Sequence, residues 1–204
     1  MRWGALSAVV GGALLVVAVL YSLIVVVGGG SEVFSETVLT PSYAITTGMS
    51  LLSTVLILFG LVGLNLRQSE AAGTLGRVGF LVAFLGTALV VGTVWTEFFV
   101  APSLAVEAPE FLDTEEIPGL LNVGFALSYS LLSLGWALFG MAALRAGIYP
   151  RWVPILLIIA ALIGLVPFSG GAAPFALGIA IALLGFFSLR PGVSISAGES
   201  SRVR

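Results

Sequence analysis

Residues 43–100 read YAITTGMSLLSTVLILFGLVGLNLRQSEAAGTLGRVGFLVAFLGTALVVGTVWTEFFV. Two apolar runs, 43–66 and 78–100, are separated by a short loop of polar and small residues at 68–76. Each run has the roughly 20 apolar residues that a transmembrane helix needs. Arg67 and Arg77 flank the loop, so a helical hairpin would place both on one side of a membrane. The stretch predicts a polytopic helical membrane protein.

Similar apolar runs precede and follow this hairpin. Together they predict an all-α bundle of six transmembrane helices, at residues 4–27, 43–66, 78–100, 120–144, 152–168 and 174–189. We expect one six-span domain over residues 1–192, followed by a flexible cytoplasmic tail over 193–204. The first run has about 23 apolar residues, longer than the roughly 7–15 of a signal peptide. It is therefore interpreted as a retained span.

The charges divide between the two sides that these six spans define. All eight cationic residues fall on one side: Arg2, Arg67, Arg77, Arg145, Arg151, Arg190, Arg202 and Arg204. The acids fall on the other side, in 28–42 and 97–119, except Glu70 and Glu199. Cytoplasmic loops of membrane proteins carry the excess of positive residues. We therefore expect both termini in the cytoplasm and the chain in a bacterial or archaeal inner membrane.

Composition supports this class and narrows the chemistry. The chain is 59% hydrophobic and 9% charged, against about 25% charged in soluble domains. It has no Cys and no His, and all its cationic residues are Arg, so there is no Lys. Thiolate nucleophiles, imidazole bases, Cys- or His-bound metals and Schiff-base lysines are thereby excluded. We expect no cofactor, no metal, no nucleic-acid partner and no enzymatic activity.

The last two spans leave an alternative open. Each has only about 17 residues, the short end of the spanning range. They are joined by FSGGAA at 168–173, with Pro167 and Pro174 on either side. A re-entrant hairpin would return Arg190 to the same side, so the charges do not decide between the two arrangements. We expect two full spans, because a re-entrant loop must satisfy its backbone groups inside protein or a cavity.

Polar residues inside the spans suggest a solute path. Glu97 follows Arg77 by 20 positions, about 30 Å along a helix, and so lies near the outer boundary of the hydrocarbon. Thr93 lies one turn below it, and Asn122 and Tyr129 belong to the next span. The functional hypothesis is a cation or proton site. The alternative is an interfacial carboxylate that reaches water beside Trp95.

Span 43–66 carries a band of hydroxyl residues that includes Thr46 and Ser50. In span 120–144, Tyr129 and Ser133 share a face at positions i and i+4, and Trp136 lies one turn further. These two faces would form a solute path with Thr46, Ser50, Thr93, Glu97, Asn122 and Tyr129 as candidate residues. The structural alternative is hydrogen bonding between helices, which hydroxyl residues often provide in membranes.

The connector LRAGIYPRWVP at residues 144–154 resembles one in small uncharacterised bacterial multi-pass membrane proteins. In those proteins an Arg-rich turn that ends in Pro-Arg-Trp leads into a strongly apolar helix. The resemblance implies a membrane protein and carries no assigned activity. Physical chemistry explains the same pattern: cytoplasmic arginines, a helix-breaking Pro150 and an interfacial Trp152.

Nearly continuous apolarity favours a non-catalytic bundle, either an accessory subunit or a binder of a lipid or another hydrophobic ligand. The alternative is a small-solute or cation transporter or channel with its path between spans 43–66 and 120–144. Beyond the lipid bilayer, the partner would be another membrane protein or a second copy of the chain. A cavity that joins Thr46, Ser50, Tyr129 and Glu97 would favour transport, and a dry, close-packed centre would count against it.

Overall fold

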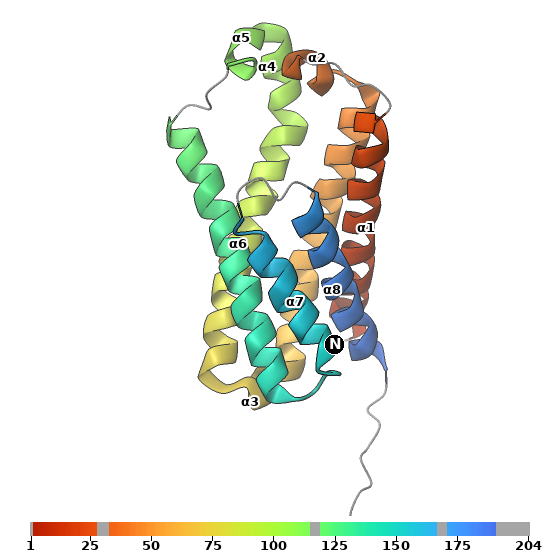
Figure 1. Cartoon of the computed structure of the whole chain (residues 1–204), viewed down its shortest axis with the longest axis vertical. Helices are drawn as coiled ribbons and strands as arrows, with labels where there is room; N and C mark the ends of the chain where they lie inside the picture. The colour runs from red at the N-terminus through yellow and green to blue at the C-terminus, as the bar shows by residue number, and fades with distance from the viewer. Residues whose placement is uncertain (1, 28–32, 115–118, 167–170, 191–204) are drawn as a thin grey trace, which may run out of the picture.

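A computed structural model describes residues 2–27, 33–114, 119–166 and 171–190. In this part of the chain every regular element is a helix (Figure 1). The helices are α1 (Arg2–Val27), α2 (Phe34–Val38), α3 (Pro41–Phe99), α4 (Ala101–Glu107), α5 (Pro109–Leu112), α6 (Gly119–Ala146), α7 (Trp152–Ile163) and α8 (Ala172–Leu189). The all-α prediction is confirmed for these residues. The tail at 193–204 lies outside the described residues.

Helix α3 is two antiparallel arms, residues 41–72 and 74–99, that meet at Gly73. Gly73 has φ 59° and ψ −147°, a conformation that only glycine adopts readily. The far ends of the arms lie together, because the Tyr43 hydroxyl donates to the Glu97 carbonyl oxygen at 3.4 Å. The expected loop at 68–76 is therefore helical except at Gly73. Gln68, Glu70 and the alanines after it are good helix formers, which extend the first arm up to Gly73.

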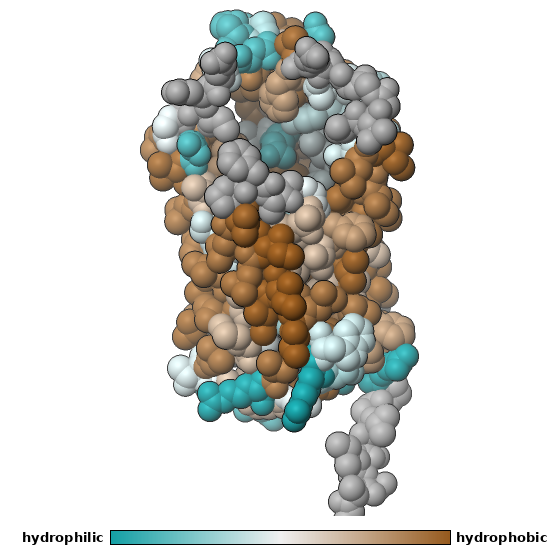
Figure 2. Space-filling view, viewed as in Figure 1, coloured by the Kyte–Doolittle hydropathy of each residue, from teal (hydrophilic) through white to brown (hydrophobic). Residues whose placement is uncertain are grey.

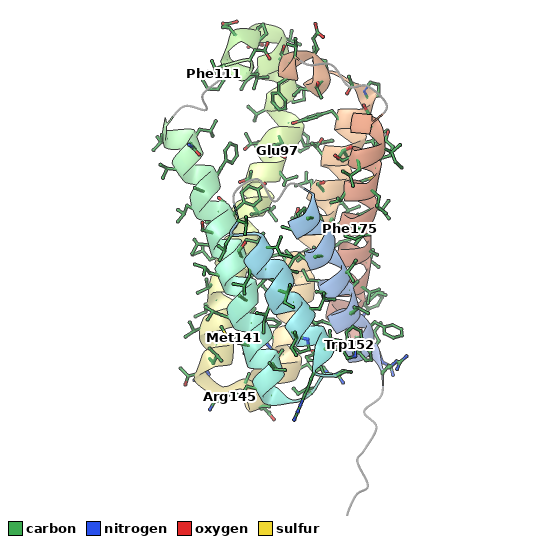
Figure 3. The ribbon with its side chains drawn as sticks, in the orientation of Figure 1. Glu97, Phe111, Met141, Arg145, Trp152 and Phe175 are labelled. Carbon is green, nitrogen blue, oxygen red and sulfur yellow. The ribbon has the colours of Figure 1, made fainter. Side chains whose placement is uncertain are left out.

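The long helices form one bundle in which neighbours in space follow chain order. α1 packs on α3 and α8, α3 on α6, α6 on α7, and α7 on α8. The described ends of the chain, Arg2 and Arg190, lie at the same end of the bundle, because Gly185 of α8 contacts Ala5 of α1. We name it the arginine end, since Arg145 lies there (Figure 3) and Arg67 donates to the Ser188 carbonyl oxygen at the end of α8. Arg77 follows the Gly73 turn by four residues, and Arg151 directly precedes α7. The opposite end, with α2, α4 and α5, is the acidic end.

The half of the bundle near the arginine end has a close-packed core. Its largest buried apolar side chains include Leu61, Leu64, Phe139, Leu157, Ile181 and Leu184. Helices approach closely at glycines: a Cβ atom on Gly135 would overlap the Ala83 backbone, and one on Gly86 would overlap Leu132. Such small-residue contacts are how helices pack tightly without a hydrophobic driving force between them.

Helices α7 and α8 form a hairpin that covers only part of the bundle. α7 has 12 residues, about 18 Å, whereas α1 has 26 residues, about 39 Å. Gly171, just before α8, contacts Val19 of α1, eight residues before Val27 and so about 12 Å short of the end of α1. Figure 1 shows α7 and α8 ending below α1 and α6. The last residues of the predicted span 152–168 fall among those not described.

The short helices at the acidic end pack together as a cap. The Asp113 carboxylate accepts from the Ser35 backbone N–H at 2.9 Å and from the Ser35 hydroxyl at 2.7 Å. Below these bonds, Val38 packs with Ala101 and Ala105 in a small apolar cluster. The cap therefore links the segment after α1 to the segment after α3.

The face of the bundle in Figure 2 is apolar between two polar ends. Large side chains such as Phe59, Leu81 and Val17 are exposed along the bundle. Within the described residues, four helices, α1, α3, α6 and α8, are long and apolar enough to cross a membrane. The chain is a helical bundle of the membrane-protein type.

Candidate ligand pocket

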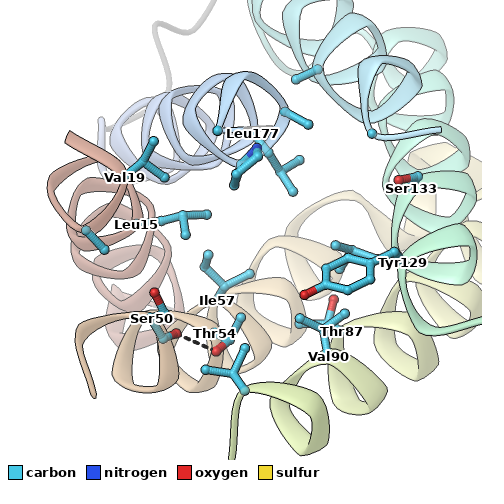
Figure 4. A pocket seen from close by; sticks show the side chains of 18 of the residues that line it. Leu15, Val19, Ser50, Thr54, Ile57, Thr87, Val90, Tyr129, Ser133 and Leu177 are labelled. Atoms are coloured by element: carbon cyan, nitrogen blue, oxygen red, sulfur yellow. Dashed lines mark hydrogen bonds between the residues drawn. The ribbon is translucent and has the colours of Figure 1, made fainter. Parts of the chain in front are cut away.

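A cavity of about 640 Å³ lies in the half of the bundle toward the acidic end. Its walls come from α1, both arms of α3, α6, and the α7–α8 hairpin (Figure 4). Most of the lining is apolar, including Leu15, Val19, Ile57, Val90, Leu132 and Leu177. Figure 2 shows the surface hollowed above the hairpin, between α6 and α1. Among the described residues, the short hairpin does not extend over this side of the bundle, where the cavity opens.

The floor of the cavity is a hydrogen-bonded pair from α3 and α6. The fully buried Trp136 donates its indole N–H to the Thr87 hydroxyl oxygen at 3.1 Å. Thr87 in turn donates to the Ala83 carbonyl oxygen at 2.6 Å. Both polar groups are thereby satisfied, as buried polar groups normally are. Below them the packed core closes the way toward the arginine end, so the cavity is blind.

Glu97 stands near the mouth. It lies on the second arm of α3, below the cap (Figure 3), and among the described residues that line the cavity it alone carries a charge. The phenol groups of Tyr43 and Tyr129 lie near its carboxylate. In the described part of the chain no arginine lines the cavity, since the arginines lie at the other end. The mouth is therefore an apolar surface with one carboxylate.

Seven hydroxyl residues add polar groups to the walls. The Thr46 hydroxyl donates to the Ser42 carbonyl oxygen at 2.9 Å. The Thr54 hydroxyl donates to the Ser50 carbonyl oxygen at 2.6 Å. The hydroxyls of Ser50, Tyr129 and Ser133 make no hydrogen bond to another described residue. They are available to a ligand or to water.

The structure brings four of the six candidate residues together: Thr46, Ser50, Glu97 and Tyr129 line the same cavity. Thr93 instead lines a separate shallow groove with Gly124 and Ser128, because it lies on the flank of its arm. Asn122 lines neither pocket and is exposed. It shares a helical face with Tyr129, but lies seven residues, about 10 Å, further out on the unpacked end of α6.

Other lining residues were not among the candidates. Ser133 and Trp136 share the face of Tyr129 and were visible in the pattern of α6. Thr87 precedes Val94 by seven positions and Glu97 by ten, a spacing that places all three near one helix face. The sequence does not indicate that the hairpin residues Ala160, Ala161 and Gly164 line a cavity, because small apolar residues are frequent throughout the chain.

The site is equipped for binding. Among the described residues no group of three or more His, Cys, Asp or Glu could hold a metal ion. Among the described lining residues, Glu97 is the one carboxylate, and hydroxyl groups supply most of the other polar atoms. An apolar cavity with a few convergent polar groups is the usual form of a small-molecule site. Comparison of the chain with protein-family models, with curated proteins and with solved structures finds no match.

Proposed function

We propose that this protein is a non-catalytic integral membrane protein that binds a lipid-like, amphipathic molecule in the cavity above the α7–α8 hairpin. The observation that carries the proposal is the cavity itself, about 640 Å³ and mostly apolar. Small-molecule sites typically measure about 300–1,000 Å³. The cavity opens between the apolar hairpin and the acidic end (Figure 2), so an amphipathic molecule at the bilayer surface reaches it, and water reaches it as well. A protein of this kind would serve as an accessory subunit or as a carrier of its ligand.

The orientation is also a proposal. Six helical segments alternate in direction, namely α1, the two arms of α3, α6, α7 and α8, although α7 and α8 stop short of the acidic end. Arginines gather at one end and most acids at the other. The positive-inside rule then favours cytoplasmic termini in the cell membrane, with the pocket in the outer leaflet.

Transport is the second candidate function. It is supported by the cavity that joins Thr46, Ser50, Glu97 and Tyr129. An open channel is disfavoured, because the buried Trp136 and the packed core below it leave no path toward the arginine end. A transporter would need the arginine half to open in a second state. Lipid binding requires no such rearrangement and is therefore preferred.

The binding proposal can be tested with Trp136 as a reporter. Trp3, Trp95 and Trp152 are exposed on the surface of the bundle, so Phe can replace them. The single-tryptophan protein is placed in phosphatidylcholine nanodiscs and titrated with an alkyl alcohol that carries bromine, a short-range quencher, at its chain end. We expect saturable quenching, because the chain end would reach the cavity floor while lipid-phase bromine stays outside the buried indole.

Two matched variants locate the binding site. Ser50→Phe places a ring in the cavity, and Ser130→Phe places the same ring on the exposed face of α6. Displacing two buried methylene groups costs about 1.6 kcal/mol, roughly a fifteenfold loss of affinity. We expect this loss in Ser50→Phe and not in Ser130→Phe. Equal quenching in both variants, or no saturable quenching at all, would contradict the proposal.

A further inference from the structure

The Glu97 carboxylate gives the pocket a negative charge. A carboxylate in an apolar, partly buried site is costly unless a cation or hydrogen-bond donors accompany it. The described residues offer it no arginine and no hydrogen bond, and its charged neighbours at the acidic end, Glu107, Glu110 and Asp113, are also negative. The partner that this carboxylate lacks within the described chain can come from the ligand.

The surroundings of Glu97 suit an organic cation rather than a small metal ion. A metal ion needs several oxygen ligands, whereas a single carboxylate beside apolar walls is a weak metal site. The Tyr129 ring points into the cavity (Figure 4), and an aromatic face attracts an ammonium group. The free hydroxyl of Ser50 adds an acceptor on the opposite wall.

The depth of the cavity defines the rest of the ligand. Thr87 on the floor precedes Glu97 by ten residues, about 15 Å along the arm. This is about the length of an extended dodecyl chain. The residues between these two levels, including Val90, Val94 and Leu132, are apolar. A linear alkyl chain would therefore fill the cavity when its head group lies at Glu97.

Given the proposed function, on which this inference rests, we propose that the pocket selects alkylammonium amphiphiles. The ammonium head pairs with the Glu97 carboxylate beside the Tyr129 ring, and the alkyl chain extends to the floor at Thr87 and Trp136. Fatty acids and alkyl sulfates, whose heads are anions, are disfavoured at the same place.

The test uses the single-tryptophan protein in phosphatidylcholine nanodiscs and three bromine-ended dodecyl probes, with trimethylammonium, hydroxyl or sulfate heads. Quenching of Trp136 is compared at equal concentrations of each probe in the bilayer. We expect the ammonium probe to bind at least about tenfold more tightly than the alcohol, and the sulfate more weakly than both. Glu97→Gln should reduce the ammonium probe to the level of the alcohol.

Glu107→Gln is the matched control. It removes one negative charge from the same end of the molecule, but Glu107 is exposed on α4 and does not line the cavity. It should keep the preference for the ammonium probe. If Glu97→Gln also keeps it, surface potential explains the preference and the inference fails.

The remaining outcomes separate the inference from the proposed function. If all three probes quench Trp136 equally and Ser50→Phe weakens all three, the pocket binds amphiphiles without regard to charge. That result overturns the inference and leaves the proposed function intact. If no probe gives quenching that Ser50→Phe weakens, both are overturned.

Discussion

Helix α6 passes through two regions that differ in packing. Between Ser133 and Ala143, near the arginine end, most of its residues are buried against α3 and α7. Between Gly119 and Ser130 almost all are exposed, because the α7–α8 hairpin ends below them. Both regions belong to one apolar helix, although the outer one carries more polar residues, among them Asn122 and Tyr129. An apolar sequence thus places α6 in a membrane. The length of the adjacent α7–α8 hairpin decides which part of α6 borders a packed core and which part borders a cavity.

The largest expected difference between the two regions is at their glycines. In Gly135→Ala the new methyl group would overlap the Ala83 backbone, so α3 and α6 must separate. Overpacking of this kind costs about 1–3 kcal/mol. Gly124 has no atom within 4 Å of the corresponding position, so Gly124→Ala should be neutral or stabilise the helix by about 0.5–1 kcal/mol. The free energy of unfolding in mixed micelles of sodium dodecyl sulfate measures both.

A similar pair exists on the second arm of α3. Gly86→Ala should destabilise the protein as Gly135→Ala does, because its methyl group would overlap the Leu132 backbone. Gly92→Ala should be neutral or stabilising like Gly124→Ala, because no described atom lies within 4 Å of the Cβ position at Gly92. If all four variants shift the unfolding free energy equally, the two regions do not differ in packing as described.

The next effect concerns the boundary between the regions. Thr87→Val would leave the buried Trp136 N–H without its acceptor, which should cost about 1–3 kcal/mol of stability. Thr96→Val is the control, because Thr96 makes the same bond to a carbonyl four residues earlier but is exposed. Its effect should stay within about 0.5 kcal/mol. The free energy of unfolding in the same micelles measures both effects. If Thr87→Val changes it as little as the control does, the hydrogen bond between Thr87 and Trp136 does not stabilise the cavity floor.

The sequence predicts much of the arginine half and less of the acidic half. Long apolar runs and flanking arginines indicate the helices, and the reversal between 66 and 78 is visible as a polar interval. That Gly73 alone makes the turn is not visible, because Gly76 nearby is an equally plausible turn residue. The height at which the α7–α8 hairpin ends depends on packing against α1, which the apolar pattern does not encode.

The candidate pocket shows the same limit. Thr46, Ser50, Glu97 and Tyr129 are polar residues in apolar runs, and this contrast is enough to find them. Thr93 and Asn122 share that contrast but lie outside the cavity, because small rotations and the outward course of α6 separate them from it. The pairing of Thr87 with Trp136 joins residues 49 positions apart, which the pattern of either helix alone does not reveal.

The most direct test of the account is the accessibility of single cysteines, which the absence of native cysteine makes clean. A membrane-impermeant trimethylammonium thiosulfonate is applied to intact cells and, separately, to inverted membrane vesicles, and Glu110→Cys and Arg145→Cys report the two faces. We predict that Ser50→Cys reacts with the reagent from the Glu110 face, which is outside, and that the buried Ala143→Cys reacts from neither face. The account is contradicted if Ser50→Cys is as unreactive as Ala143→Cys, or if it reacts only from the Arg145 face.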